Sequence, residues 1–502
     1  MTLTRTVAVA GATALVALGA AACQPYFGAD DSVTATALGQ LTRLTWTAAQ
    51  EDDAGESVTQ YGIEVNGVEV SRLPAASGLS CVLTGLSGGT AYTLSITAYG
   101  NTGQYSGDYG SNLGNMPRVR TSYTTPTIGA PAGATKACVS PTDSDGDRLP
   151  NAVENGGGTF VSAAATGTSS ANADTDADGI RDGNEVLGTA AGQNLYGMGT
   201  RPTKKDLLFE FDWFVDANDC ASHSHRPTAA MVDRVRTAFA ATPVANPNGT
   251  TGVNVIGDYG QGGLFTGGNV IADADGVLTS GVNSAEFVNF KAANFSSQRE
   301  GIFHYVLLPH RYNTTSGSSG QAEIQGDDLI VSLQCASGTV NTGNTIMHEV
   351  GHNLNLRHGG NVDLPNYKPN YNSVMNYKYQ FPGVDTTCDS VGDGVLAYST
   401  GSRASLNESA LLETNGVCNG VDIDWNKSGV IDAGAVSADI NRNSTSQLGG
   451  TGDGLASVLA DFNDASNMCL TCINDGDGAP ADPNDVSAHE VITEQPSPAV
   501  AR

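Results

Sequence analysis

The run HEVGHNLNLRH, at residues 348–358, constrains the chain more than any other feature of the sequence. His348 and His352 lie four positions apart, so on a helix they project from one face and can bind one metal ion. His358 can reach the same ion only if the helix stops and the chain turns back. Asn355 stands where that turn needs left-handed backbone angles, which asparagine tolerates. The run therefore predicts a helix with a sharp turn behind it, and three imidazoles at one metal site.

Glu349 follows the first histidine directly and supplies the group that hydrolytic chemistry at such a site requires. Three protein ligands are typical of catalytic zinc and leave a fourth position open for water. Zinc lowers the pKa of that water to about 7, and a neighbouring carboxylate can take its proton and later pass it to a leaving amine. We therefore expect Zn²⁺ bound by His348, His352 and His358, with Glu349 as the general base.

Residues 373–377, Ser-Val-Met-Asn-Tyr, extend the pattern shortly after the third histidine. Together with the zinc motif they resemble the metzincin zinc metalloproteases, in which a Met-turn forms a floor beneath the metal. The resemblance implies that Met375 is that methionine, and that Tyr377 lies beside the zinc and helps to stabilise the oxyanion. Asn355 departs from the family pattern, which usually has glycine at this position.

The metzincin resemblance covers residues 204–468 and implies an α/β, or α+β, domain with a mixed sheet and an active-site helix. It also implies a cleft with an edge strand above the zinc, on which a peptide lies as an added strand. The segment 320–333 is the candidate edge. The residues themselves favour an α/β order, with apolar runs typical of strands at 206–214, 252–256, 302–308 and 329–333, and a helical apolar stripe behind Pro227.

The segment 31–125 has short alternating apolar runs that predict an all-β sandwich. Asn66-Gly67 separates two such runs, which is a strong hairpin signal. Trp46 and the spacing Leu86-x5-Tyr92, which is like a tyrosine corner, make this segment resemble a fibronectin type III domain. The resemblance implies a spacer or a module that binds a cell-surface or matrix ligand, with no chemistry of its own.

Residues 126–140 are rich in Pro, Gly and Ala and predict a linker, and two acidic loops follow at 141–190. Each loop places carboxylates at offsets 1, 3, 5 and 12, an arrangement with which a loop can surround Ca²⁺. The loops resemble thrombospondin type 3 calcium repeats, although Arg148 stands at the sixth position of the first, where an EF-hand has Gly. A solvated acidic linker is the alternative. The predicted calcium ligands are Asp143, Asp145, Asp147 and Glu154 in the first loop, and Asp174, Asp176, Asp178 and Glu185 in the second.

Two later segments are also informative. From Asp424 to Asp432 oxygens stand at alternating positions, but Ala435 occupies the twelfth place, so the sequence leaves a third calcium loop and an exposed polar turn as alternatives. We expect residues 452–468 to close the domain with a helix. The acidic tail at 473–502 is expected to be disordered.

The beginning of the chain predicts export. An apolar run from Val7 to Leu18 follows Arg5 and precedes small residues, which predicts a signal peptide at 1–22. Cys23 follows three alanines, as at a bacterial lipoprotein site. The protein is therefore expected to be secreted, or to be an extracellular surface lipoprotein that contacts the membrane only through lipid on Cys23.

Cysteine parity agrees with export. The chain has 9 cysteines, and without Cys23 an even number is left for disulfides in an oxidising compartment. Proximity in the sequence predicts that Cys388 pairs with Cys418 and Cys469 with Cys472. A four-cysteine zinc site is less favoured, because no second close pair accompanies Cys469-x-x-Cys472.

Charge excludes several classes of protein. Lys and Arg number 24 against 52 Asp and Glu, which gives a formal net charge of −28. A nucleic-acid partner would need basic patches, so we expect none. The composition also excludes a coiled coil and a multi-span membrane protein.

The remaining histidines lack the spacing of metal ligands and are expected to have surface or structural roles. They are His223, His225, His304, His310 and His489.

These observations together predict a secreted or surface-anchored zinc-dependent endopeptidase that acts on protein or peptide substrates and is stabilised by calcium. One alternative is a calcium-binding cell-surface adhesion protein with a secondary or inactive protease fold. Glu349 and Tyr377 argue against it, because a pure binding protein needs no general base. The other alternative is a zinc hydrolase that acts on a non-peptide bond.

Overall fold

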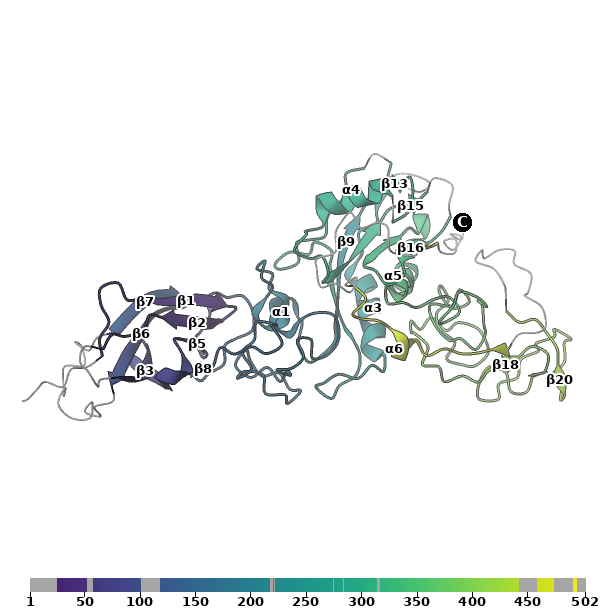
Figure 1. Cartoon of the computed structure of the whole chain (residues 1–502). Coiled ribbons are helices and arrows are strands. Elements are labelled where there is room, and N and C mark those ends of the chain that lie inside the picture. Colours follow the sequence, from purple (N-terminus) through teal and green to yellow (C-terminus); the bar gives the residue numbers. More distant parts are fainter. Residues whose placement is uncertain are drawn as a thin grey trace, which may run out of the picture.

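The computed structural model describes residues 25–51, 57–100, 118–216, 220, 222–273, 275–282, 284–313, 317–441, 458–473 and 491–493. The predicted signal peptide, Cys23 and most of the acidic tail lie outside these residues. Figure 1 shows, in chain order, two small sheets, a loop region around α1 (Asp182–Leu187), a mixed sheet with helices, and a loop-rich lobe around β18 (Leu406–Asn407). Among the described helices, none combines the length and the apolar character that crossing a bilayer requires.

Residues 33–139 form two four-stranded antiparallel sheets that share one core. Leu44 and Trp46 of the first sheet pack in the same cluster as Ile63 and Ile96 of the second. The first sheet has the order β1 (Val33–Leu38), β2 (Leu41–Trp46), β5 (Ser80–Leu83), β8 (Cys138–Val139), and the second β4 (Val68–Pro74), β3 (Val58–Val65), β6 (Ala91–Gly100), β7 (Arg118–Thr124), with a 3-10 turn at Ala75–Ser77.

Two predicted local features are present in these sheets. Asn66 and Gly67 join β3 to β4 with φ angles of 53° and 79°, the left-handed angles that a tight hairpin turn needs, so the predicted hairpin is confirmed. The Tyr92 hydroxyl accepts a hydrogen bond from the Ser87 backbone N–H at 2.9 Å, which is the kind of contact that defines a tyrosine corner.

The segment 126–140, predicted as a linker, is packed rather than extended through solvent. Ala130 is buried in a small cluster that also contains Leu41 of β2 and Leu149 of the loop region. Cys138 lies in β8 and forms a disulfide with Cys81. The first sheet and the loop region are therefore joined by a small common core.

The central sheet has the strand order β12-β9-β14-β17-β16-β22. β12, β9, β14 and β17 are parallel to their neighbours, and β16 runs antiparallel to both β17 and β22, so the predicted mixed sheet is confirmed. All residues of β9 are buried, including the acidic residues Asp206, Glu210 and Asp212. The bounds are β9 (Asp206–Trp213), β12 (Asn254–Asp258), β14 (Phe303–Leu308), β16 (Gly320–Glu323), β17 (Asp328–Val331) and β22 (Val491–Thr493).

Helices cover both faces of this sheet. α3 (Ala229–Ala241) and α5 (Thr339–Asn353) pack on the face that carries Phe209 and Val306, whereas α4 (Ala285–Asn294) packs on the face that carries Leu208 and Tyr305. Thr228 caps α3, because its side chain accepts a hydrogen bond from the Met231 N–H. Short elements surround the sheet: α2 (Leu195–Met198), β10 (Val215–Asp216), β11 (His223–Ser224), β13 (Val277–Leu278), β15 (Arg311–Tyr312) and a 3-10 turn at Gln334–Ala336.

The lobe that follows α5 has little regular structure and is held by a disulfide between Cys388 and Cys418, one of the two predicted pairs. The other predicted pair, Cys469–Cys472, is also formed, and a fourth disulfide joins Cys220 to Cys335. Within 458–468, where we expected a closing helix, the chain forms a short strand and a single helical turn. The elements are β18 with β21 (Val458–Leu459), β19 (Leu411–Leu412) with β20 (Ala435–Val436), and α6 (Asp464–Asn467).

Candidate active site

The three histidines of the sequence motif come together beneath the central sheet. His348 and His352 are fully buried on α5, and His358 lies just beyond it with 1% of its surface exposed. One ligand atom from each side chain lies within 4.8 Å of those of the other two. The ring centroids are 5.0 Å apart for His348 and His352, 5.4 Å for His348 and His358, and 4.8 Å for His352 and His358. This group can hold a metal ion.

The end of α5 explains how His358 reaches its partners. Asn355 has a φ of 72°, so the residue adopts the left-handed conformation that the sequence predicts. Its N–H donates to the carbonyl of His352 at 2.9 Å, and the Leu356 N–H donates to the carbonyl of Gly351 at 2.8 Å. These two bonds form a Schellman motif, which ends the helix and turns the chain back.

Acceptors on this chain hold each histidine ring in one orientation. Nδ1 of His348 lies 2.7 Å from the carbonyl of Val374, and Nδ1 of His352 lies 2.8 Å from the carbonyl of Leu356. A carbonyl oxygen can only accept, so each Nδ1 carries the proton and each Nε2 carries the lone pair that a metal needs. The third ring has a carboxylate partner that we did not predict: Nδ1 of His358 lies 3.4 Å from Oδ1 of Asp363.

Replacing Asp363 with Ala is expected to weaken zinc binding about 10-fold to 100-fold, because partners of this kind orient the ligand ring and raise its basicity. The measurement is zinc affinity by competition with a chelator, and Asp233→Ala, at an exposed site on α3, is the matched control. An unchanged affinity would show that Asp363 does not orient His358.

Met375 lies directly against the metal-binding helix. Its sulfur occupies the space that a side chain at Gly351 would need, so α5 requires glycine here for this close approach. The neighbouring Tyr377 places its ring centroid 4.2 Å from that of His358 and 5.9 Å from that of His348. The residues of the predicted Met-turn therefore lie beside α5, His348 and His358.

Glu349 is fully buried and lies between α5 and the strand β16. A Cβ atom at Gly320, the first residue of β16, would overlap the Glu349 carboxylate. The segment 320–333, predicted as the edge of the sheet, contains β16 and β17, and neither is an edge strand in the described chain. The tail strand β22, in a segment expected to be disordered, pairs with β16, with Gln321 opposite Thr493 and Ala322 opposite Ile492.

A cavity of about 540 Å³ opens beside Tyr377. Its wall includes the aromatic residues Tyr367 and Trp425 and the oppositely charged residues Lys378 and Asp439. The volume is in the range that accommodates side chains or small ligands. The cavity is thus bounded by Tyr377 of the Met-turn on one side and by residues between Ile423 and Asn441 on the other.

The two acidic loops share one hydrogen-bond pattern. In the first loop the Asp143 carboxylate accepts bonds from the N–H groups of Gly146 and Arg148 at 2.8 and 3.0 Å. In the second loop Asp174 accepts from Ala177 and Gly179 at 2.8 and 2.9 Å. The sixth residue is left-handed in both, with φ of 83° for Arg148 and 95° for Gly179, so arginine occupies the position without changing the loop.

The predicted calcium ligands gather in groups that can hold a cation, and further acids join them. The aspartates at the first, third and fifth positions of each loop bring ligand atoms within 4.8 Å of one another. Asp147 and Glu154 are also grouped with Asp182, which comes from the second loop. Glu185 and Asp206 are buried close enough to interact electrostatically. The sequence places Asp182 at the ninth position of its loop, but nothing in it assigns this side chain to the first group.

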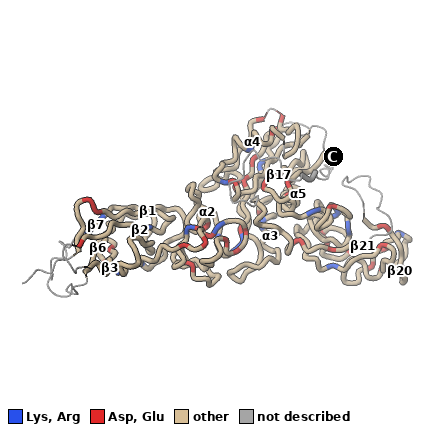
Figure 2. The backbone as a smooth tube through the Cα atoms, viewed as in Figure 1, with Lys and Arg blue, Asp and Glu red and all other residues tan. Residues whose placement is uncertain are grey.

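Burial, together with repulsion between neighbouring carboxylates, raises the pKa values of these groups. Burial, and then the neighbouring aspartates, raise the pKa of Asp147 to about 6 and that of Glu154 to about 8. Burial is also the main cause for Asp182, whose pKa rises to about 7, and for Asp176, whose pKa rises to about 8. A cation among them would remove this repulsion and return the carboxylates to the ionised form. Figure 2 shows Asp and Glu segments close together in the loop region near α2, with Lys and Arg segments among them.

The lobe contains two related loops. In the loop from Asp424 to Asp432, Asp424 accepts from the Gly429 N–H at 2.7 Å, and a buried carboxylate from outside the loop, Glu413, accepts from the Asp432 N–H at 2.8 Å. The alternatives of a calcium loop and a polar turn are both compatible with these bonds.

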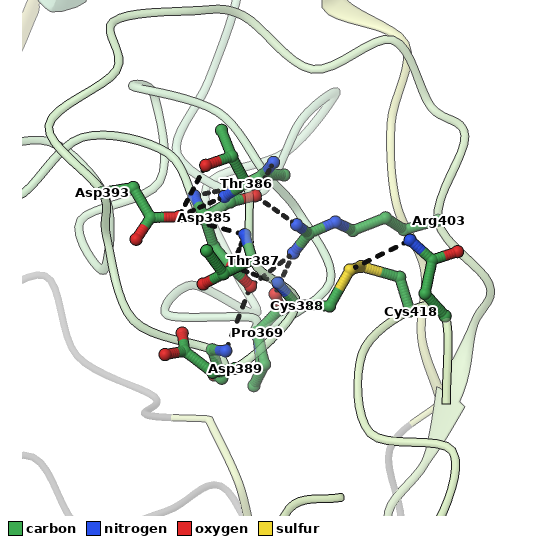
Figure 3. The surroundings of a disulfide bond; sticks show 12 residues. Pro369, Asp385, Thr386, Thr387, Cys388, Asp389, Asp393, Arg403 and Cys418 are labelled. Atoms are coloured by element: carbon green, nitrogen blue, oxygen red, sulfur yellow. Dashed lines mark hydrogen bonds and ion pairs between the residues drawn. A yellow bond between two sulfur atoms is a disulfide. The ribbon is translucent and has the colours of Figure 1, made fainter. Parts of the chain in front are cut away.

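We did not predict the other loop, which begins at Asp385 (Figure 3). Asp385 accepts from the Ser390 N–H at 3.0 Å, the same first-to-sixth bond, but the Arg403 guanidinium lies 3.2 Å from its carboxylate. In this loop the chain supplies its own cation.

The remaining histidines divide into two kinds. His304 is buried, its Nδ1 lies 3.1 Å from the Asn353 side-chain oxygen, and burial lowers its pKa to about 4, which agrees with the structural role that we expected. His489 lies outside the described residues. His223, His225 and His310, whose sequence spacing gives no sign of a metal site, form a group with Asp216 whose ligand atoms lie within 4.8 Å of one another.

Comparisons with known proteins add little to this geometry. No family model matches the chain, and no curated protein matches it significantly. A solved structure that matches a part of it is the spore cortex lytic enzyme SleM of Clostridium perfringens, at 23% sequence identity over 20% of this chain and 27% of that chain. The TM-score is 0.14, so the likeness carries no argument about fold or function.

Proposed function

We propose that the chain is an exported, zinc-dependent endopeptidase of the metzincin type. The observation that carries this proposal is the convergence of His348, His352 and His358 in a buried site, with each Nδ1 held by an acceptor on the chain. Two carbonyls and a carboxylate leave the ring nitrogens oriented as ligands, and three imidazoles suit zinc better than calcium, which prefers oxygen. When bound, zinc acts as a Lewis acid that acidifies a water molecule and polarises a carbonyl.

The chain supplies the proton transfer and the polar contacts around that ion. Glu349 adjoins the first ligand, and its burial beside Gly320 keeps its carboxylate away from bulk water. We assign it the role of accepting a proton from the attacking water and donating it to the leaving amine. Tyr377 lies against the ring of His358. In this position its hydroxyl can donate a hydrogen bond to the carbonyl oxygen of the substrate as negative charge develops on that oxygen.

An extended peptide is the substrate that fits the sheet. A peptide bound as an added strand uses main-chain hydrogen bonds to an edge, and β16 is the strand that adjoins Glu349. Residues 491–493 already pair with β16 in antiparallel register. We therefore assign β16 as the strand on which substrate binds, in competition with the tail.

Deleting residues 474–502 removes the strand that competes with substrate for β16, so we expect the apparent KM for a peptide substrate to fall and kcat to stay unchanged. The expected fall is about tenfold, which corresponds to the free energy of about one net hydrogen bond of the β22 pairing. Deletion of 494–502, which leaves β22 in place, is the matched control and should have no effect. Steady-state kinetics on both truncations decides. Equal KM values in all three proteins would mean that the tail does not compete with substrate.

Calcium is the ion that we propose for the acidic loops at 141–190. The donors are carboxylate oxygens, which suit a hard cation, and burial, followed by the neighbouring carboxylates, raises the pKa values of Glu154 and Asp176 to about 8. Because these loops pack between the N-terminal sheets and the central sheet, bound calcium would stiffen the connection between them.

The adhesion alternative rests on the N-terminal sheets. Their strand orders, β1-β2-β5 and β4-β3-β6-β7, and the Tyr92 contact support the fibronectin type III resemblance. We propose that this unit binds or spaces the enzyme at a surface, and that the four disulfides reflect export to an oxidising compartment. If adhesion were the whole function, cell-surface binding would persist and no peptide would be cleaved by the zinc-loaded protein.

A further inference from the structure

A second group of histidines lies at the carboxyl ends of two neighbouring strands. β9 and β14 are parallel, with Trp213 opposite Leu308. Asp216 follows β9 and His310 follows β14, so the sheet register brings these residues to the same edge. His223 and His225 return to this place because β11 pairs with β10, with His223 opposite Asp216.

The four side chains surround one point. Nε2 of His225 lies 2.7 Å from one oxygen of Asp216, and Nδ1 of His310 lies 3.2 Å from the other. The centroids of the three histidine rings are 4.5, 5.5 and 5.4 Å apart. Asp216, His225 and His310 are each at least 90% buried, and only His223 reaches solvent in part.

The backbone and a disulfide hold this group in position. The His225 N–H donates to the carbonyl of Phe214 at 3.0 Å, and the carbonyl of His310 accepts from the N–H of Gln334 at 3.0 Å. The disulfide between Cys220 and Cys335 ties the ribbon that carries His223 to the same turn. Cys220 is therefore not a thiolate and does not compete as a ligand. Two backbone hydrogen bonds and one disulfide thus hold the segments that carry the four potential ligands.

We propose that Asp216, His223, His225 and His310 bind a second zinc ion with a structural role. Three imidazoles and one carboxylate give four nitrogen and oxygen donors, the set of a closed tetrahedral zinc site. Calcium would require six or more oxygens, and only one carboxylate is present in the group. All four ligands come from the protein, so no coordination position is left for water and substrate, in contrast to the three-histidine site on α5. The second ion fastens the β10–β11 ribbon to the end of the central sheet.

Metal content tests this proposal separately from the proposed catalytic site. The protein is loaded with zinc in the presence of excess calcium and then dialysed to remove unbound zinc. Elemental mass spectrometry should then find about two zinc ions per chain. His223→Gln and His352→Ala should each lose one ion, and the double variant should lose both. Ser224→Ala, next to His223 on the exposed side of the ribbon, is the matched control and should lose none. If only the catalytic assignment failed, His352→Ala would change nothing while His223→Gln still lost its ion.

Retention of the full zinc content by a folded His223→Gln protein would overturn the proposal. If that variant does not fold, as judged by circular dichroism, X-ray absorption spectroscopy of zinc-loaded His352→Ala decides instead. A single zinc with three imidazole ligands supports the second site, and protein without zinc, or zinc with a different ligand set, overturns it.

Discussion

Replacing Glu349 with Gln is expected to reduce peptide hydrolysis by about 10²-fold to 10⁴-fold, the contribution of a positioned general acid and base. Gln has almost the same shape and can occupy the same buried position beside Gly320, but it cannot accept a proton. The loss should appear in kcat, because the transfer occurs in the transition state. Casein hydrolysis and a fluorogenic peptide series measure it in purified, zinc-loaded protein.

Two controls separate the loss of chemistry from a loss of structure. The zinc content of Glu349→Gln should equal that of the original protein, because the three histidines and their acceptors are unchanged. Glu286→Gln, a change at a half-buried residue of α4 on the opposite face of the sheet, should keep full activity. Retained cleavage by Glu349→Gln would remove this residue from the role of base.

Removing calcium is expected to destabilise the loop region at 141–190 and the packing of its neighbours. Ligand that binds only the folded state adds about 2.7 kcal/mol to the free energy of unfolding per site at a hundredfold excess over Kd. The test is calorimetry of protein dialysed against a chelator and resupplied with zinc, with and without calcium. We expect a clearly lower melting temperature without calcium, and faster self-digestion.

The pH dependence of the melting temperature of the calcium-free protein provides a second, independent test of calcium binding. In the fold the pKa values of Asp147, Asp182 and Glu154 rise to about 6, 7 and 8, above the usual values of about 4 for an unfolded chain. The folded state therefore holds more protons than the unfolded state. The contribution to stability is fully present below about pH 4 and is lost as pH rises through 6 to 8. Without calcium the protein should melt at a higher temperature at pH 5 than at pH 8, and calcium should remove this difference.

Variants locate the effect in the loops. Asp176→Asn removes one ligand from the second loop and should reduce the rise in melting temperature on adding calcium. Asp233→Asn, on the exposed side of α3, should not. Melting curves that are the same with and without calcium at both pH values would contradict calcium binding in these loops.

The features that the sequence predicts well depend on local rules. The helix at 339–353 and its turn follow from a four-residue spacing and from the tolerance of Asn355 for left-handed angles. The buried strands of the central sheet follow from apolar runs that need cover on both faces. The hairpin at Asn66-Gly67 follows from turn chemistry. Each of these signals lies within a few residues of the structure that it predicts.

The features that the sequence does not reveal depend on register between distant strands. Asp216 and His310 meet only because β9 and β14 are parallel neighbours, and no spacing in the chain shows that pairing. Asp182 joins the first acidic loop from the second, and Arg403 reaches Asp385 across a disulfide-bonded lobe. The pairing of β22 with β16 likewise joins segments that lie far apart in the sequence.

A crystal of zinc-loaded protein, measured on both sides of the zinc absorption edge, tests the central claim most directly. The account predicts an anomalous difference peak between the rings of His348, His352 and His358, about 2.0–2.1 Å from one nitrogen of each. A fully loaded crystal whose zinc peaks all lie elsewhere, with these three rings around empty density, would contradict it.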